Sequence, residues 1–275
     1  MALLSGCGGA ARQLDGGAGA RSLSHSESAQ ALLLRVADAA GRSTAAGAGQ
    51  AATVRIRTSE SRTVVFNATS ANAFTLIGSA IRTTTVTSRS AAQVVETDLP
   101  PRFATAASAA AWRLSGTPNP IPVRTTGLRL RVGPGRFGFL PEGTPLTYSD
   151  VMRLPPDPAA IARAIRAHTP TDAQGPALLL RQYAFLLGRA PVTGAVRGAI
   201  LSAMAELPGI RLCAPPQGRF VDVCIDAAND RYEALIDPRN GTLVAIQQRI
   251  LAPSPLFPTL QSGFVVERDA FSVSA

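Results

Sequence analysis

Leu154-Pro-Pro-Asp157-Pro158-Ala-Ala160 opens the stretch that decides the fold of this chain, and Asp237-Pro-Arg-Asn-Gly241 lies near its end. Between these motifs, three segments with apolar residues at helical spacing are followed by strand-like runs. In the second motif, proline presets one turn angle and Asn-Gly readily adopts the left-handed conformation, which is typical of a hairpin. Residues 154–250 therefore predict helices followed by antiparallel hairpins, an order that favours a binding or packing module.

Local signals set the ends of the three helices. Asp157 is suited to be an N-cap with Pro158 at the first helical position, and His168-Thr-Pro170 ends that helix. The second helix is expected from about residue 176, after a segment at 171–174 with the spacing of a capping box. The third covers residues 192–207 and ends at Pro208-Gly209.

The second of these helices should be the most buried. Its Leu179, Tyr183 and Leu186 lie at i, i+4 and i+7, so we expect one buried line between the sheet and the flanking helices. Arg197 lies on the opposite face of the third helix from Ile200, and we expect its truncation to have little effect.

The N-terminal half is typical of a helix followed by antiparallel strands. Ser28 is suited to cap a helix over residues 29–40 that ends at Gly41. Runs rich in Val, Ile and Thr predict strands at 52–56, 63–66, 74–86 and 92–97. Leu99-Pro-Pro101 is expected to close this sheet region. It is followed by a helix at 104–114 and a long loop out to Tyr148, within which residues 127–132 alternate like a strand.

The chain therefore divides into three segments. Residues 1–28 are expected to hold a truncated signal with the lipobox and a flexible tether, residues 29–150 a helix with antiparallel strands and a long loop, and residues 151–275 three helices followed by antiparallel hairpins. The second and third segments are expected to form one continuous fold. The predicted class is α+β, a curved antiparallel sheet packed against several helices.

Composition bounds the function. Hydrophobic residues make up 46% of 275 residues, enough for a real core, and all 27 basic residues are arginine. Residues 1–150 hold 15 arginines against 8 acids, whereas residues 151–275 hold 12 against 10. The basic half favours anionic lipid headgroups, envelope polymers or nucleic acid, or simply solubilises the protein. One tryptophan and three tyrosines offer little base stacking, so we expect no nucleic-acid partner. No window approaches about 18 consecutive apolar residues, the length of a membrane-spanning helix.

Cys7 is the candidate lipid attachment site. Leu4-Ser5-Gly6-Cys7 matches the lipobox of bacterial lipoproteins, and residues 8–28 are small, polar and glycine-rich, as expected of a flexible tether. Only Met1-Ala-Leu-Leu precede the box, too few for a complete signal peptide. Either the match is chance, or the start codon is placed too far downstream and most of the signal is missing.

Cys213 and Cys224 are the candidate disulfide. They lie in consecutive strand-like runs, 210–214 and 220–226, whose apolar rows alternate with the cysteines. If the apolar rows face the core, both sulfurs lie on the outward face of one hairpin, where a disulfide would fit an oxidising compartment. The alternative is two unpaired small hydrophobes. The spacing is not that of a zinc site.

Other motifs carry little chemistry. Gly133-Pro-Gly135-Arg-Phe-Gly138 has the spacing of a dinucleotide loop, but Phe139-Leu-Pro141 cannot open the phosphate-binding helix, so we interpret it as a turn. His25 lies in the tether, and His168 complements a helix dipole. An acidic cluster spans the last strands and could perform acid–base work or hold calcium, but alternation favours a solvated face. Its members are Asp222, Asp226, Asp230, Glu233 and Asp237.

Several short motifs resemble a family of functionally uncharacterised envelope proteins from high-GC Gram-positive bacteria. They are Phe103-Ala-Thr, Ala111-Trp112, Gly116, Pro145-Leu-Thr-Tyr-Ser-Asp150, Leu154-Pro-Pro-Asp157-Pro158-Ala-Ala, Leu207-Pro-Gly-Ile-Arg211 and Leu235-Ile-Asp-Pro-Arg-Asn-Gly-Thr-Leu243. The resemblance covers roughly residues 27–271. It implies an extracytoplasmic domain similar in outline to LolA and RseB, a curved antiparallel sheet embracing helices. Members usually carry a membrane-spanning helix, which this sequence lacks, so a lipid on Cys7 would be the substitute anchor. The resemblance transfers no functional residues.

Together these observations predict a non-enzymatic, extracytoplasmic domain, membrane-anchored through a lipid or secreted, that binds an apolar ligand or an envelope partner. We expect no catalytic residues, metal or cofactor. One alternative is a regulatory or sensor domain that binds a partner and no small ligand. Another is a hydrolase that uses the acidic cluster. The binding of ligands by this fold is an analogy.

Overall fold

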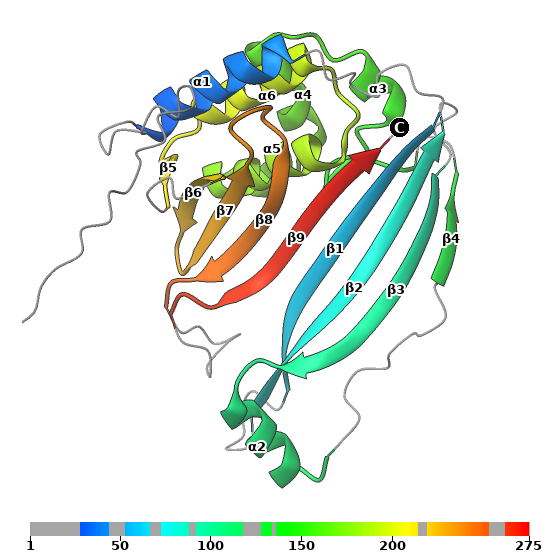
Figure 1. The fold of residues 1–275 in the computed structure, drawn as a ribbon, viewed down its shortest axis with the longest axis vertical. Helices are drawn as coiled ribbons and strands as arrows, with labels where there is room; N and C mark the ends of the chain where they lie inside the picture. Colours follow the sequence, from blue (N-terminus) through cyan, green and yellow to red (C-terminus); the bar gives the residue numbers. More distant parts are fainter. Residues whose placement is uncertain are drawn as a thin grey trace, which may run out of the picture.

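The protein is an α+β structure built on one nine-stranded antiparallel sheet (Figure 1). The computed structural model describes residues 28–43, 53–66, 73–87, 92–117, 128–133, 136–213, 219–252 and 262–274. The strands are β1 (Thr53–Phe66), β2 (Phe74–Thr87), β3 (Ala92–Phe103), β4 (Leu128–Val132), β5 (Arg211–Leu212), β6 (Val221–Ala227), β7 (Asp230–Ile236), β8 (Leu243–Ile250) and β9 (Val265–Ser274). Their order across the sheet is β4-β3-β2-β1-β9-β8-β7-β6-β5.

Among the described residues, six α-helices accompany the sheet. They are α1 (Ala29–Arg42), α2 (Ala106–Leu114), α3 (Tyr148–Met152), α4 (Pro158–His168), α5 (Pro176–Arg189) and α6 (Gly194–Ala205). The sheet curves, with α1, α4, α5 and α6 gathered against its β5–β9 half, while α2 lies at the far end of β2 and β3 (Figure 1). No helix among the described residues is long and apolar enough to cross a membrane.

Strand β9 joins the two predicted halves into one sheet. It follows every other strand in the sequence, yet it lies between β8 and β1 and pairs with both. Residues 29–150 and 151–275 thus share one continuous hydrogen-bonded ladder.

The N-terminal strands are longer than the sequence predicts. Strand β1 is a single strand of 14 residues, so the prediction of two strands at 52–56 and 63–66 was wrong. Strand β3 continues to Phe103, so Leu99-Pro-Pro101 does not close the sheet. Pro100 and Pro101 lie in a bulge, since the register passes from Ser79↔Leu99 to Ile77↔Arg102. A proline cannot donate to the ladder, and a bulge removes the need for it to do so.

Helix starts follow the capping signals. Asp157 accepts hydrogen bonds from the backbone N–H groups of Ala159 and Ala160 at 3.2 and 3.1 Å, and Ser28 caps α1 in the same way. Helix α5 begins at Pro176, as predicted. Helix α3 was not predicted, although Thr147 and Asp150 form a complete capping box at its start.

The core lies between α5 and the inner face of the sheet, which we define as the face that packs against α5. Leu179, Tyr183 and Leu186 are buried, with 4%, 1% and 0% of their surfaces exposed, as predicted.

Helices α1 and α6 pack with their backbones in close approach. A Cβ on Gly194 or Gly198 would lie 2.5 Å from the carbonyl oxygen of Ala40 or 2.7 Å from that of Ala37.

The side chain of Arg197 is more enclosed than its place on the third helix indicates, and the small effect of its truncation stays a prediction. It is half-buried, its Nε is enclosed with no hydrogen-bond partner among the described residues, and its Nη1 donates to the carbonyl oxygen of Asn240 at 3.4 Å. The turn between β7 and β8 folds back over α6 at Gly241, where a Cβ would lie 2.5 Å from Leu201. Arg197, which would be exposed if α6 were an isolated helix, is therefore covered by this turn.

We predict that Leu186→Ala lowers the free energy of unfolding by about 2–5 kcal/mol, because it leaves a cavity at a fully buried site. Urea denaturation measures the change. Arg163→Ala is the control, since this side chain on α4 is 73% exposed. Equal stability of the two variants would show that α5 is not the centre of the core.

Candidate functional site

Charged side chains line the inner face of the sheet beyond the apolar core. Along β1, Val54 and Ile56 are buried in the core, and alternation places Thr58, Glu60 and Arg62 on the same face. The register brings inner-face residues of neighbouring strands next to them. We call the resulting set the inner charge ladder; it consists of Glu60, Arg62, Arg82, Glu96, Glu267 and Asp269.

Two arginines hold the ladder together. Arg62 donates from Nη1 to Oδ1 of Asp269 at 2.9 Å and from Nη2 to Oδ2 at 3.1 Å, and it forms an ion pair with Glu267 at 3.2 Å. Arg82 bridges Glu60 at 2.9 Å and Glu96 at 2.8 Å. The Arg62–Asp269 pair, which uses both carboxylate oxygens, fixes orientation as well as charge. The ladder therefore ties β9, β1, β2 and β3 together on their inner face.

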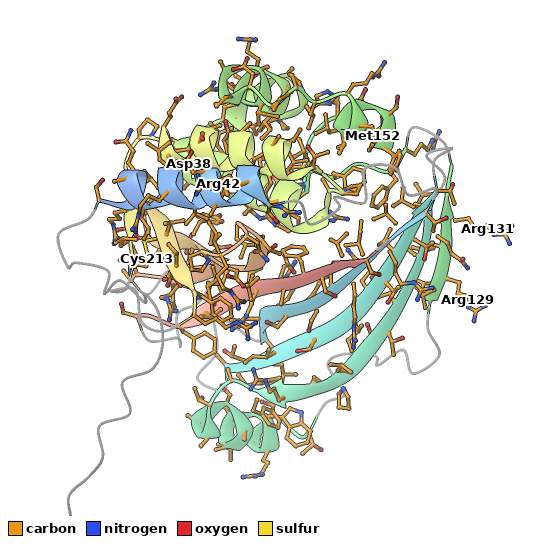
Figure 2. The ribbon with its side chains drawn as sticks, turned by 45° about the horizontal axis from the view of Figure 1, so that its top comes forward. Asp38, Arg42, Arg129, Arg131, Met152 and Cys213 are labelled. Atoms are coloured by element: carbon orange, nitrogen blue, oxygen red, sulfur yellow. A yellow bond between two sulfur atoms is a disulfide. The ribbon has the colours of Figure 1, made fainter. Side chains whose placement is uncertain are left out.

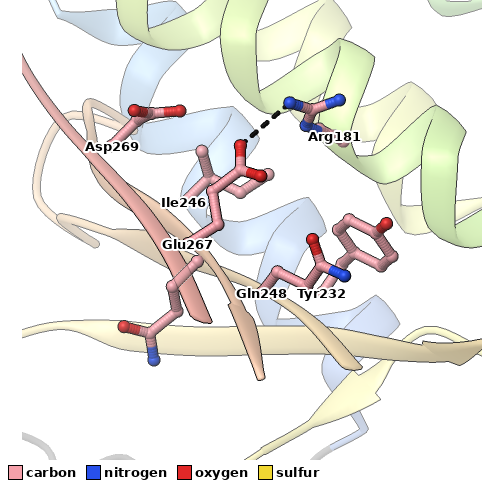
Figure 3. Close-up of a pocket in the computed structure, with 7 residues that line it drawn as sticks. Arg181, Tyr232, Ile246, Gln248, Glu267 and Asp269 are labelled. Carbon is pink, nitrogen blue, oxygen red and sulfur yellow. Dashed lines mark hydrogen bonds and ion pairs between the residues drawn. The ribbon is translucent and has the colours of Figure 1, made fainter. Parts of the chain in front are cut away.

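Helix α5 joins the ladder through Arg181. Its Nη2 lies 2.9 Å from Oε1 of Glu267 (Figure 3). Its Nη1 binds Glu142. Beneath this contact is a cavity of about 10 Å³, lined among others by Tyr232, Gln248 and Asp269. This volume holds about one water molecule.

Two carboxylates of the ladder, those of Glu60 and Asp269, are costly to ionise. Asp269 is only 1% exposed. Burial raises the pKa values of Asp269 and Glu60 above their ordinary range, against the opposite effect of Arg62 on the first and of Arg82 on the second. The arginines thus only partly offset the desolvation, as is usual for buried ion pairs.

Aromatic side chains adjoin the ladder at the end of the sheet remote from α5. Phe66 and Phe74 stack with ring centroids 5.1 Å apart, and Phe103 packs against Trp112 of α2 at 5.3 Å. Val64 lies on the same face of β1, between Arg62 and Phe66, and is 39% exposed. We call Val64, Phe66, Phe74, Phe103 and Trp112 the aromatic end. Phe74 is buried at 1% exposure, whereas Phe66, Phe103 and Trp112 are half-buried and Val64 is exposed. The inner face there is partly exposed, apolar and next to fixed charges.

This site was not identified from the sequence. A signal for it is present in the alternation Ile56-x-Thr58-x-Glu60-x-Arg62, because these residues share one face of a strand. Charges in the second half broke the apolar pattern, and that break produced the prediction of two strands.

The two C-terminal cysteines form a disulfide, with Cα atoms 5.7 Å apart. Cys224 alternates with core Val223 and pairs with Arg211, so the bond lies on the outer face of the β5–β6 hairpin (Figure 2). Cys7 and His25 lie outside the described residues. His168 is half-buried at the end of α4, with Nδ1 3.2 Å from Oγ1 of Thr144.

The acidic cluster is not the solvated face that alternation favoured, because Glu233 and Asp237 are only 2% and 7% exposed. Its members are dispersed among separate ion pairs. Asp226 binds Arg211 and Arg231, Glu233 binds Arg249, and Asp237 binds Arg239. Within the described ranges, no group of three or more His, Cys, Asp or Glu side chains is arranged to hold a metal ion. Of Gly133–Gly138, residues 134 and 135 are not described.

Asp222 is the least satisfied member of the cluster. It is half-buried, and its Oδ1 is enclosed without a hydrogen-bond partner. Burial, helped by the nearby charge of Glu233, raises the pKa of Asp222 to about 6.

No family model, no curated protein and no solved structure matches this chain in the comparisons.

Removal of the disulfide should destabilise the protein. The bond closes a loop with a sequence separation of 11, for which loop-closure entropy corresponds to about 3 kcal/mol. We expect Cys213→Ser/Cys224→Ser to lower the free energy of unfolding, measured by urea denaturation, by about 3 kcal/mol. We expect Cys7→Ser to match the wild type. A wild type in which all three cysteines are alkylated without reductant would contradict the bond.

Asp222→Asn should stabilise the protein at neutral pH. The pKa of Asp222 in the folded protein, about 6, lies above the ordinary value of 3.8. Ionised Asp222 therefore destabilises the fold fully above pH 6, and this destabilisation disappears as the pH falls towards 4. We expect a gain of about 1–3 kcal/mol at pH 7.5 and roughly a third of that gain at pH 4.5. Denaturation at both pH values measures it. A gain that does not depend on pH would contradict the assigned cause.

Proposed function

We propose that this chain is a non-enzymatic, extracytoplasmic domain of the cell envelope that binds a protein partner on the inner face of its sheet, at the aromatic end. The observation that carries the proposal is the half-exposed aromatic end beside the inner charge ladder. Here β1, β2 and β3 extend beyond α5, so that part of the inner face is not covered by the main helical layer (Figure 1).

The chemistry of this surface suits a partner. Tryptophan, phenylalanine and arginine are enriched at protein interfaces, and aromatic anchors with arginines carry much of the binding energy. Val64, at 39% exposure, lies between the stacked phenylalanines and Arg62. Arg62 is held by two carboxylates, so the charges beside the apolar patch are fixed before a partner arrives. A preorganised surface loses less entropy on binding.

A carrier of an apolar ligand is the second candidate, and the aromatic end is the observation that favours it. The cavity beneath α5 has a volume of about 10 Å³ and charged groups in its lining. Apolar ligands prefer pockets of roughly 300–1,000 Å³ with mostly apolar walls. A ligand would therefore rest on the aromatic end, where a partner segment fits equally.

A hydrolase is the third candidate, and the geometry gives it little support. Paired carboxylates in acid–base catalysis must converge on one substrate. In the acidic cluster, Asp226, Glu233 and Asp237 are each engaged by different arginines.

The location that we propose is extracytoplasmic, with the domain anchored through a lipid on Cys7 or secreted. A disulfide between Cys213 and Cys224 fits an oxidising compartment. A likeness to the LolA and RseB fold belongs to the same proposal. An antiparallel sheet curved around helices is compatible with it.

Site-specific photo-cross-linking tests the proposal. We expect a photo-reactive residue at Val64 to form a covalent adduct with one protein in intact cells, because this side chain lies at the centre of the surface. The same residue at Arg163, on the exposed face of α4, is the control and should form none. Mass spectrometry identifies the adduct. An adduct with lipid would favour the carrier, and the absence of any adduct specific to position 64 would reject the site.

A further inference from the structure

The outer face of β1, β2, β3, β4 and β9 is cationic and lacks acids. Strands β1, β2, β3, β4 and β9 contain five acids, and alternation places all of them on the inner face: Glu60, Glu96, Asp98, Glu267 and Asp269. Six arginines occupy outer positions on the same strands: Arg55, Arg57, Arg102, Arg129, Arg131 and Arg268. On these five strands the outer face thus carries arginines alone, whereas the inner face carries all the acids together with Arg62 and Arg82.

The arginines are arranged with hydroxyl groups in two neighbouring rows across five strands. One row is Ser272, Arg57, Thr83, Val95 and Arg129, and the other is Ser274, Arg55, Thr85, Gln93 and Arg131. Strands lie about 4.8 Å apart, so each row spans roughly 20 Å. Arg129 and Arg131 point away from the body of the molecule (Figure 2).

These arginines are uncompensated. All six are exposed, and none forms an ion pair with another described residue, whereas Arg62 and Arg82 on the inner face each bind two carboxylates. Dispersed solubilising arginines would be interspersed with acids. Here, uncompensated charges of one sign cover one broad face.

The same face has a hollow suited to a phosphate group. It has a volume of about 420 Å³ and is lined by Arg55, Arg57, Ile81, Thr83, Ser272 and Ser274. Guanidinium groups bind phosphate oxygens with two parallel hydrogen bonds, and serine and threonine hydroxyls add further donors. The lining contains no carboxylate that would repel an anion.

We propose that this outer face docks onto a membrane surface rich in anionic phospholipids, with headgroup phosphates entering the hollow between Arg55 and Arg57. The breadth of the charged face fits a surface better than a single strand of polymer. Single-stranded nucleic acid is disfavoured because the outer positions of the five described strands carry no aromatic side chain for stacking. Docking by this face does not depend on the partner site, which lies on the inner face.

Vesicle co-sedimentation tests this docking. The full chain carries Cys7→Ser, so that no acyl chain contributes. We expect it to bind phosphatidylcholine vesicles only when they contain phosphatidylglycerol, and to dissociate as salt is added. Each arginine near an anionic surface strengthens binding roughly fivefold. Arg55→Gln/Arg57→Gln/Arg129→Gln/Arg131→Gln should therefore weaken it by roughly a hundredfold or more.

A second quadruple variant provides the matched control. Arg42→Gln/Arg153→Gln/Arg163→Gln/Arg166→Gln removes the same number of charges from exposed positions of the helical layer. We expect it to bind within a few fold of the parent, and both variants to keep the parent's melting temperature. Equal loss in the two variants would show a net-charge effect and overturn the proposal. Binding of duplex DNA or polyphosphate without binding of phosphatidylglycerol vesicles would overturn it as well.

Discussion

The pairing of β9 with β8 and β1 is the interaction on which the rest of the structure depends. On one side of β9 lie β1–β4, and on the other lie β5–β8 with the main helices. Hydrogen bonds alone would join these halves, but β9 also supplies Glu267 and Asp269, which bind Arg62 of β1 and Arg181 of α5. The strand that closes the sheet therefore also connects the N-terminal strands to the helical layer.

The pleat of the sheet gives the two faces different chemistry. Because successive side chains point to opposite sides, a run such as Arg55-Ile-Arg57 presents exposed arginines outside and a buried isoleucine inside. Further along β1, the same alternation turns Glu60 and Arg62 inward, where neighbouring strands supply opposite charges. One strand thereby contributes to the apolar core, to the inner charge ladder and to the cationic outer face.

Local signals in the sequence predicted every described α-helix except α3. Asp157, Pro158 and Ser28 act within one turn of the residues that they cap, so their effect is visible without the fold. The strands were harder to predict, since the continuity of β1 through Glu60 and Arg62 depends on partners more than 20 residues away in sequence. The position of β9 in the sheet and the cover over Arg197 likewise arise from distant segments. The inner charge ladder could not be predicted for this reason.

The place of β9 also bears on how the chain is made. During synthesis, β1 emerges early and must keep one edge open until β9, the last strand in the sequence, becomes available. An open edge strand is a template for unwanted pairing with other chains. Pairing across some 200 residues is also slow, because distant segments must meet before any contact forms. A nascent chain of this design would benefit from a chaperone that covers β1 until its last strand arrives.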